Sequence, residues 1–418
     1  MAKIKQVLAE EILDSRGNPT IETTIILSDG VWAKSSVPNG ATKGVYEASQ
    51  LRDGDTKRFG GLGVKNAVLN VQTIIAPKIV GMDCTDQQKI DKLMIELDGT
   101  QNKGRLGANA ILSVSQAVAK AGAKSSLLPL SVYIRQFLGL NDKPAKIPTP
   151  MFNIIEGGKH AQGSINFQEF LLVPASAKTY SESLEIASAV YSSLRTLLRD
   201  RNLSTLNADE GGFSPVTSSN IEALNLLKQA IDQSGYKFSF DVFLGVDAAA
   251  HFFLDGKEYR LLDRPTPYNQ DDLVEYYTNI FNEYSLIYIE DPFAEDDWEG
   301  WKKIYNALSS KTLIIGDDIT TTNPYRLQLA LDNNVINGMV IKPNQAGTVT
   351  ETLAVVEMAK FKNLKIVVSQ RSGETMDDFI ADFAVGVGAD YVKFGAPVHE
   401  RVLKYNRLTE IEAELKQI

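Results

Sequence analysis

Apolar residues follow two different patterns along the chain. In the first third, "TIETTIILSDGVWAKSSVP" contains two β-rich runs joined by Ser-Asp-Gly, which is typical of a hairpin. The segments "VKNAVLNVQTIIAPKIVG" and "QQKIDKLMIELDG" have helical apolar spacing and end at glycine. The Ala- and Ser-rich segment "GANAILSVSQAVAKAGAKSS" predicts a helix with close neighbours. This part of the chain is therefore predicted to be α+β.

A proline-rich stretch, "NDKPAKIPTP", separates this part from the remainder. Beyond it, short apolar runs alternate with longer helical stretches such as "IEALNLLKQAIDQSG". A chain of 418 residues is long enough for two domains. We therefore predict an α+β N-terminal capping domain over residues 1–138 and a C-terminal βα domain over residues 139–418.

The apolar runs of the second part each end in a charged or polar residue. The runs are "FLGVD", "LIYIED", "LIIGDD", "GMVIK", "KIVVSQRS" and "DYVKFG". Their terminal markers are Asp247, Glu290, Asp317, Lys342, Gln370 and Lys393. After the first interval the markers are about 25 residues apart, the length of one strand plus one helix.

Repeated βα units over this length favour an α/β fold with a closed (β/α)8 TIM-like barrel. In a barrel the carboxyl ends of the strands meet at one mouth, where active sites lie. A doubly wound open sheet is the structural alternative, but its G-x-G-x-x-G fingerprint is missing from the sequence. Any single marker could simply begin a solvated loop, whereas six at barrel spacing favour a common site.

Asp247, Glu290 and Asp317 would place three carboxylates at that mouth. Like charges so close together need a cation, and oxygen ligands suit Mg²⁺. Zinc is poorly supported, because the three histidines do not occur at ligand spacing. The alternative is helix capping, which we expect instead for the second acid of each pair, Asp291 and Asp318.

Lys342 ends its strand immediately before a proline. Burial beside bound cations would lower its pKa and make it a candidate general base. The alternative is an exposed lysine, or a salt bridge to one of the three acids.

Two Gly-rich segments carry further acids. "IIEGGKHAQGSINFQEF" contains His160, Gln168 and Glu169, and "LNADEGGFSP" contains Glu210. Glu169 and Glu210 could share a proton and act on a leaving hydroxyl group, although a turn is the simpler interpretation of each segment alone.

Arg371, Ser372 and Lys393 supply donors suited to phosphate and carboxylate oxygens. Together with the acids and Lys342 they predict one type of reaction. The lysine removes a proton α to a carboxylate, a β-hydroxyl group leaves, and cations stabilise the negative charge that develops.

Composition restricts the partners and the setting. A net charge of −9 disfavours nucleic acid and anionic membranes, but a small anionic substrate responds to the local field. No apolar run is long enough to enter a membrane as a span, and the N-terminal residues lack an apolar signal core. Cys84 is the only cysteine, so we expect a reducing, cytoplasmic setting.

Ten motifs occur in an order and spacing that resemble the enolase family over essentially the full chain. They are "EILDSRGNPT", "LRDGD", "ELDGTQNKGRLGANAILSVS", "NFQEF", "DEGGFSP", "IEDPFAEDDW", "GDDITTTN", "IKPNQAGTVTET", "SQRSGET" and "KYNRL". The resemblance implies reversible dehydration of 2-phosphoglycerate to phosphoenolpyruvate, two Mg²⁺ ions per active site, and a homodimer or larger homo-oligomer. A lysine base beside Mg²⁺ is an established pattern of that superfamily, not a deduction from this sequence alone.

The resemblance also assigns roles to residues. It implies that Asp247, Glu290 and Asp317 bind the tighter metal, that Lys342 is the base, and that Glu210 with Glu169 is the acid. Thr42 falls where the family's mobile loop has a serine that reaches the second metal. The residues expected around the substrate are Thr42, His160, Gln168, Gln370, Arg371, Ser372 and Lys393.

Several positions depart from the family's usual residues. Asn39 and Lys43 replace hydroxyl residues, Glu156 replaces the asparagine of "NGG", and Phe394 replaces a threonine. "HFF" at 251–253 stands where "Ser-Glu-Phe" is usual. Gln370 replaces a histidine, and an amide cannot titrate as an imidazole does.

These departures leave alternatives open. One is an ordinary enolase that has drifted in sequence. A second is a related dehydratase that acts on a phosphonate analogue or another modified substrate, whose extra anion Lys43 could meet. The third is a catalytically weak paralogue with a binding role, including display at the cell surface. The presence of all three metal carboxylates argues for catalysis.

Overall fold

A three-stranded antiparallel sheet begins the chain in the computed structural model, which describes residues 2–41, 44–161 and 165–416. The strands are β1 (Ile4–Leu13), β2 (Pro19–Leu27) and β3 (Trp32–Ser36), in the order β1-β2-β3. The predicted hairpin is β2 and β3, so that prediction is confirmed. The sequence analysis missed β1, whose buried positions alternate only in part with exposed ones.

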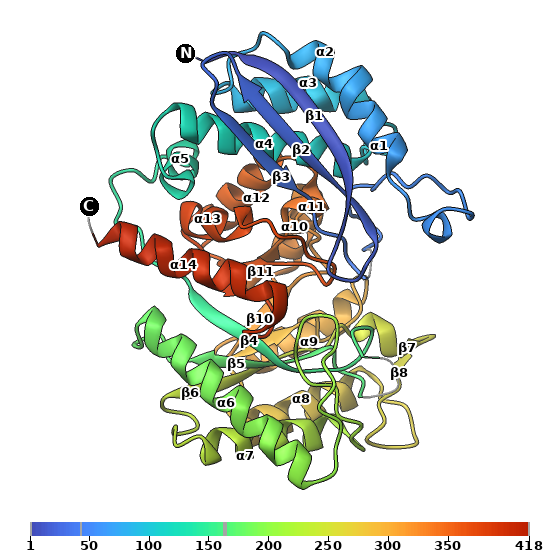
Figure 1. The fold of residues 1–418 in the computed structure, drawn as a ribbon. Coiled ribbons are helices and arrows are strands. Elements are labelled where there is room, and N and C mark those ends of the chain that lie inside the picture. The colour runs from blue at the N-terminus through green and yellow to red at the C-terminus, as the bar shows by residue number, and fades with distance from the viewer. Residues whose placement is uncertain (1, 42–43, 162–164, 417–418) are drawn as a thin grey trace.

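Helices cover this sheet on one side (Figure 1). They are α1 (Lys65–Asn70), a π-helical turn η2 (Val71–Ile75), α2 (Ala76–Ile79), α3 (Gln87–Asp98), α4 (Ala108–Ser125) and α5 (Leu130–Phe137). The predicted Ala- and Ser-rich helix is α4, which packs against β2 and β3. It also packs against two later helices, α11 (Pro343–Ala346) and α12 (Val349–Phe361). A Cβ atom at Gly122 of α4 would lie 2.6 Å from the hydroxyl oxygen of Tyr133, so the absence of a side chain at Gly122 permits this close packing.

Eight strands of the second part form a closed barrel. They are β4 (Thr149–Glu156), β5 (Glu169–Pro174), β6 (Val242–Asp247), β9 (Tyr288–Glu290), β10 (Leu313–Gly316), β11 (Gly338–Ile341), β12 (Lys365–Ser369) and β13 (Tyr391–Lys393). Their order is β10-β11-β12-β13-β4-β5-β6-β9. All six predicted apolar runs are barrel strands, and the predicted cap-plus-barrel fold is confirmed.

The barrel does not alternate strictly between strand and helix. β5 follows β4 directly and runs antiparallel to both of its neighbours, while the other neighbouring pairs are parallel. Its reversed direction places the beginning of β5, not its end, at the mouth of the barrel. Glu169, the first residue of β5, therefore reaches the same rim as the last residues of the parallel strands.

Helices surround the barrel, and some of them also support the N-terminal layer (Figure 1). They are α6 (Tyr180–Asp200), α7 (Asn220–Gln233), α8 (Gln270–Tyr284), α9 (Trp298–Leu308), α10 (Pro324–Asn333), α11 (Pro343–Ala346), α12 (Val349–Phe361), α13 (Phe379–Gly386) and α14 (Val402–Leu415). The shorter elements are η1 (Phe59–Gly61), η3 (Ala250–Phe253), η4 (His399–Arg401), β7 (Leu254–Asp255) and β8 (Glu258–Tyr259). α13 packs on α5, and α12 packs on α3 and α4, so the N-terminal layer rests on barrel helices.

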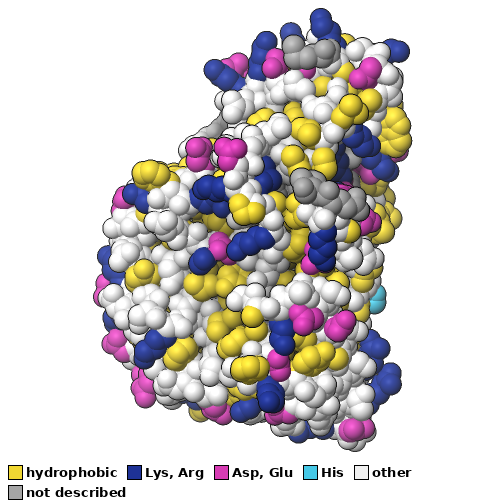
Figure 2. All heavy atoms as spheres, turned by 90° about the vertical axis from the view of Figure 1, so that its left-hand side faces the viewer, with side chains coloured by type: hydrophobic (Ala, Val, Ile, Leu, Met, Phe, Trp, Pro, Cys, Tyr) yellow, Lys and Arg dark blue, Asp and Glu magenta, His cyan; other side chains and the backbone are white. Residues whose placement is uncertain are grey.

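The surface carries charges of both signs. On the face shown in Figure 2, Lys and Arg side chains are interspersed with Asp and Glu side chains and with apolar ones. This mixture means that the net negative charge is not concentrated in one area of that face. Within the described ranges, no helix combines the length and apolar character that crossing a membrane requires.

Candidate active site

Strand register places four acids side by side on the rim of the barrel. Glu156 of β4 is opposite Glu169 of β5, Glu169 is opposite Asp247 of β6, and Asp247 is opposite Glu290 of β9. All four carboxylates are buried. Because neighbouring strands lie about 5 Å apart, this register concentrates negative charge that needs positive partners.

Lys393 supplies one of these partners from across the barrel. Its Nζ atom lies 2.8 Å from Glu290 Oε2, 2.7 Å from Glu169 Oε2 and 3.5 Å from Asp247 Oδ2. Burial opposes its charge, but these carboxylates outweigh burial and raise the pKa of Lys393. The ammonium group therefore remains charged and holds the three acids together.

The acids themselves are protonated more easily than usual. Burial, together with repulsion from Asp247, raises the pKa of Glu290 to about 8. Burial raises the pKa of Glu169 to about 7 and that of Asp247 to about 6, although Lys393 acts in the opposite direction on both. Additional positive charge at this rim would therefore stabilise all three as carboxylates.

Lys342 and Asp317 form a second charged group. Asp317 follows β10, Lys342 follows β11, and their side chains make a direct ion pair. Burial would lower the pKa of Lys342, but Asp317 outweighs it and the net pKa is raised. This direction is opposite to the one expected from the sequence, because the nearest charge to the lysine is a carboxylate.

Asp317 is held from several directions. Gln345 of α11 donates its side-chain N–H to Asp317 Oδ1 at 3.2 Å. Burial alone would raise the pKa of Asp317, but Lys342 and Lys393 hold it below its usual value. Asp317 therefore ionises more readily than Asp247 and Glu290, whose pKa values are raised.

The predicted capping roles of Asp291 and Asp318 are wrong. The helices that follow them are capped by Asp297 and Asn323. Asp291 instead accepts the main-chain N–H groups of Asp317 and Asp318 at 3.0 and 2.8 Å. Residues nearer to the helices cap them, because a loop separates the end of each strand from the helix that follows it.

Oxygen ligands for a cation are available at the rim. Two groups of described residues have potential ligand atoms within 4.8 Å of one another: His160 with Glu169 and Glu210, and Asp291 with Asp317 and Asp318. The predicted trio of Asp247, Glu290 and Asp317 is not one of these groups, and each of its carboxylates pairs with Lys393 or Lys342. The donors nevertheless fit a hard divalent ion, since they are buried carboxylates whose charge calls for a cation.

His160 lies among three acids. Its Nδ1 atom is 3.5 Å from Glu156 Oε2 and 3.9 Å from Glu169 Oε1, and its Nε2 atom is 3.8 Å from Glu210 Oε1. Burial would lower the pKa of His160, but these acids raise it to about 9. The imidazolium form is therefore favoured beside Glu169 and Glu210, the predicted acid pair.

Neutral donors hold the carboxylate of Glu210. Asn153 donates to Glu210 Oε2 at 2.7 Å, and Gln370 donates to the same oxygen at 3.0 Å. The amide oxygen of Gln370 in turn accepts from Arg401 at 2.7 Å. Although burial opposes ionisation, His160 and Arg401 lower the pKa of Glu210, which keeps it a carboxylate.

The N-terminal domain closes one side of the mouth. Arg371 is buried and pairs with Glu47, with 3.0 Å between Arg371 Nη1 and Glu47 Oε2. Ser372 accepts the main-chain N–H of Ala41 at 2.6 Å, and Asn39 and Gly373 exchange main-chain hydrogen bonds. The predicted site residue Thr42 and the departure Lys43 lie outside the described residues.

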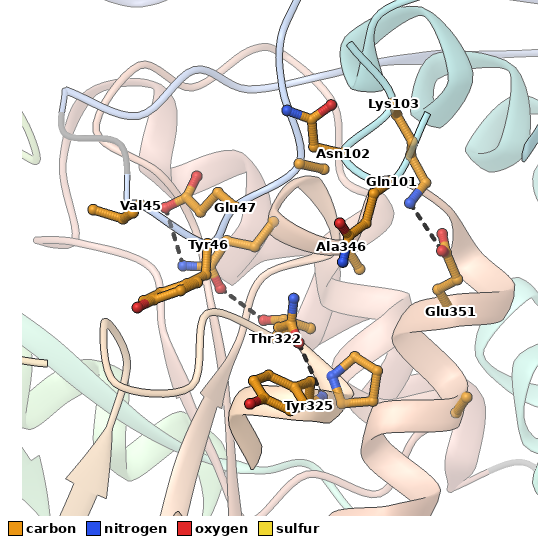
Figure 3. Close-up of a pocket in the computed structure, with 15 residues that line it drawn as sticks. Val45, Tyr46, Glu47, Gln101, Asn102, Lys103, Thr322, Tyr325, Ala346 and Glu351 are labelled. Carbon is orange, nitrogen blue, oxygen red and sulfur yellow. Dashed lines mark hydrogen bonds and ion pairs between the residues drawn. The ribbon is translucent and has the colours of Figure 1, made fainter. Parts of the chain in front are cut away.

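The larger cavity near the site does not contain the predicted catalytic groups. It measures about 860 Å³ and lies behind Glu47 and Gln345, between the N-terminal domain and the loops after β10 and β11 (Figure 3). Gln345 donates to Glu47 at 3.3 Å and accepts from Thr322 at 2.7 Å, and these side chains form its wall (Figure 3). The cavity at the mouth measures only about 20 Å³, room for about one water molecule. This volume is too small for a phosphorylated substrate, so the mouth is closed in this structure.

Two family models match the chain over most of its length. The N-terminal domain of enolase matches residues 4–134, and the C-terminal TIM barrel domain of enolase matches residues 144–418. The second match alone covers more than half of the 418 residues. The chain belongs to the enolase family. Membership of this family supports a lyase activity.

The structure explains two of the departures from usual enolase residues. Asn39 donates to Asp14 at 2.8 Å and accepts from Arg52 at 2.8 Å, so it supports the first loops of this enolase-family chain. Phe394 is buried and its ring lies 6.0 Å from that of Tyr405. Both side chains therefore have structural partners away from the four acids of the rim.

Three other departures, at positions 156, 251 and 370, contact predicted site residues or possible metal ligands. His251 pairs with Asp318, with 3.1 Å between Nδ1 and Oδ2, in a group that could hold a metal. Glu156 and Gln370 both contact the segment that carries Glu210.

Sequence reasoning missed the supporting residues of this enolase-family site. Glu47, Asn153, Gln345 and Arg401 touch predicted site residues but were not proposed from the sequence. Their partners are distant in sequence, and no local pattern marks them. The motif "IKPNQAGTVTET" contains Gln345 and was the only signal that could have suggested it.

Proposed function

We propose that this protein catalyses the reversible, Mg²⁺-dependent dehydration of 2-phosphoglycerate to phosphoenolpyruvate. The observation that carries the proposal is that Lys342 and Glu210 line one cavity with Arg371 and Ser372. A base, an acid and anion-binding donors at one mouth suit proton removal followed by loss of a hydroxyl group. Family membership supports the same reaction class.

Substrate anions would be bound by the donors of the mouth. Arg371 and Ser372 suit a phosphate group, and Lys393 suits a carboxylate. The amide of Gln168 donates to Asp247 at 3.1 Å, while its buried oxygen has no hydrogen-bond partner among the described residues. That oxygen could accept a hydrogen bond from a substrate hydroxyl group.

The proton transfers would divide between the two sides of the mouth. Lys342 removes the proton α to the carboxylate, which requires its neutral form. Its ion pair with Asp317 raises its pKa, so this pair must be broken before Lys342 can act as a base. On the other side, Glu169, whose pKa is raised to about 7, shares its proton with Glu210, and this pair, with the imidazolium of His160 beside it, delivers the proton to the leaving hydroxyl group.

Magnesium would be held by Asp247, Glu290 and Asp317, with Thr42 as a candidate ligand of a second ion. The ions would supply positive charge that stabilises the substrate carboxylate as negative charge develops on it. The raised pKa values of Asp247 and Glu290 show that these residues would benefit from such charge.

The test is turnover of purified protein. With Mg²⁺, 2-phosphoglycerate should give the new ultraviolet absorbance of phosphoenolpyruvate, and EDTA should abolish it until Mg²⁺ is restored. Absence of turnover, with Mg²⁺ binding retained, would contradict the proposal. Turnover of a phosphonate analogue would then support the modified-substrate alternative, and no turnover of either would support a binding role.

Further proposals concern organisation in the cell. A homodimer or larger homo-oligomer, a cytoplasmic location with secondary display at the cell surface, and a domain boundary between residues 138 and 139 remain proposals. The two family matches end at residue 134 and begin at residue 144, which agrees with a boundary in this interval. Light scattering of the purified protein measures the oligomer.

A further inference from the structure

Glu156 is a buried carboxylate that the proposed reaction does not use. It ends β4 and is fully shielded from solvent. Burial raises its pKa, because a carboxylate in a dry environment is unfavourable. A glutamate at this position therefore requires specific partners to offset its desolvation.

Its first partners belong to the loop that carries Glu210. Glu156 Oε2 accepts the main-chain N–H of Glu210 at 3.1 Å, and Oε1 accepts that of Gly212 at 2.6 Å. A Cβ atom at Gly212 would lie 2.8 Å from Glu156 Oε1, so the close approach requires glycine. The carboxylate thus fastens both sides of Gly211, beside the predicted acid.

Its second partner is His160. Glu156 Oε2 is the nearest of the three acidic oxygens around this imidazole, at 3.5 Å from Nδ1. The Nδ1 atom has no hydrogen-bond partner within the part of the chain that the structure describes. Glu156 is therefore placed to orient the ring between Glu169 and Glu210.

Gln370 contacts the side chain of Glu210, whereas Glu156 contacts its main chain. It donates to the Glu210 carboxylate and accepts from Arg401, which an uncharged amide can do at the same time. A protonated imidazole at position 370 would instead lie beside the guanidinium of Arg401, and like charges repel. Glu156 and Gln370 therefore both hold Glu210, Glu156 through its main-chain N–H and Gln370 through its carboxylate.

We propose that Glu156 is a positioning residue that acts as a pair with Gln370. Glu156 holds the main chain of Glu210 and orients His160, and Gln370 holds the Glu210 carboxylate. The inference rests on the proposed function, in which Glu210 serves the leaving hydroxyl group.

A double-mutant cycle tests the pairing. The proteins are wild type, Glu156→Asn, Gln370→His and the double variant, which restores both usual family residues. Each single variant should lower kcat about tenfold or more, since hydrogen bonds to a charged group are disturbed. For Glu156→Asn, KM should change less than about threefold, because Glu156 is not among the residues expected around the substrate.

The double variant should recover most of the lost kcat, so that the two single effects are non-additive by about tenfold. Full kcat in Glu156→Asn would overturn the proposal, as would single effects that multiply within about twofold in the double variant. Asp98→Asn is the matched control. Asp98 is a buried carboxylate that also accepts two main-chain N–H groups, from Thr100 at 3.0 Å and Leu106 at 2.6 Å, but in the N-terminal domain.

Hydrogen exchange supplies a measurement that is independent of turnover. Glu156→Asn should accelerate exchange of the amides at 210 and 212, while Gln370→His and Asp98→Asn should leave them unchanged. If wild type turned over no substrate, the proposed function would fail, and exchange alone would decide the contact of Glu156 with the loop. Unchanged exchange in Glu156→Asn would overturn the inference in either case.

Discussion

The two sides of the barrel mouth hold their reactive groups by different means. On the base side, Lys342 and Asp317 follow neighbouring strands and neutralise each other in a direct ion pair. On the acid side, Glu210 is held by the amides of Asn153 and Gln370, and its nearest cation, His160, is 3.8 Å away. Charge positions the base, whereas neutral hydrogen bonds position the acid.

The difference follows from where each group lies in the fold. Strand ends are fixed by the barrel, so residues at β10 and β11 need little further support. Glu210 lies in the loop between α6 and α7, and a loop residue is less constrained by its own main chain. Supporting side chains replace the missing constraint: Asn153 of β4 and Gln370, just after β12, bind the Glu210 carboxylate, and Glu156 of β4 binds its main chain.

The largest expected effect comes from removing the base. Lys342→Ala should lower dehydration by about 10³-fold or more, and should also abolish exchange of the α-proton with solvent. The measurements are ultraviolet absorbance and loss of deuterium from α-deuterated 2-phosphoglycerate. Lys34→Ala, which removes an exposed lysine paired with Glu22, is the control and should retain both activities.

If the acid side acts in a step of its own, Glu210→Gln should have a different effect from Lys342→Ala. Dehydration should fall about 10²- to 10⁴-fold, while α-proton exchange continues because Lys342 is intact. The same two measurements apply. Parallel loss of both activities would mean that the two sides do not act in separate steps.

Removing one amide donor from each side of the mouth compares how strongly each side depends on its hydrogen bonds. Asn153→Ala removes a donor to Glu210, and Gln345→Ala removes a donor to Asp317. We expect about a tenfold loss of kcat for Asn153→Ala, the effect of one hydrogen bond to a charged group. We expect a smaller loss for Gln345→Ala, because Asp317 keeps its ion pair with Lys342. A larger effect of Gln345→Ala would reverse the comparison.

The smallest effect on turnover should come from Lys120→Ala, which weakens neither side selectively. Lys120 of α4 pairs with Asp377 at 2.8 Å, and removing one partner of a buried pair should lower the free energy of unfolding by about 3 kcal/mol. Burial opposes the charge of Lys120, but Asp377 raises its pKa to about 12, while Lys120 outweighs burial to lower the pKa of Asp377.

The pH dependence of the free energy of unfolding follows from the directions of these two pKa shifts. The contribution of Asp377 is present above its unfolded pKa and is lost as pH falls through its lowered folded value. The contribution of Lys120 is present below its unfolded pKa and is lost as pH rises through about 12. Urea unfolding at pH 5, 7 and 9 should therefore show a constant difference between wild type and Lys120→Ala.

The charged residues at the ends of the parallel strands were predictable from the sequence, because each of these strands is buried. Such a strand is an apolar run, and the first charged residue after it marks the rim. Asp247, Glu290, Asp317, Lys342 and Lys393 were found in this way, and all five reach the mouth of the barrel. Their positions depend on local pattern and on one regular fold.

The reversed direction of β5 could not be predicted in this way. Its sequence, "EFLLVP", is as apolar as a parallel strand, because both faces of barrel strands are covered. Only the antiparallel pairing with β4 and β6 shows that Glu169, the first residue of β5, lies at the rim. The contact of Arg371 with Glu47 also could not be predicted from local sequence, since the two residues are 324 positions apart.

The sequence by itself determined the cap-plus-barrel fold and the chemical types of the residues at the mouth. The tertiary structure decided which of these residues touch: Lys342 with Asp317, Lys393 with three acids, and Glu210 with Asn153 and Gln370. Strands and helices follow from short-range periodicity, which one segment contains. Contacts between side chains of separate segments, and the pKa values that result, depend on distances that only the folded chain sets.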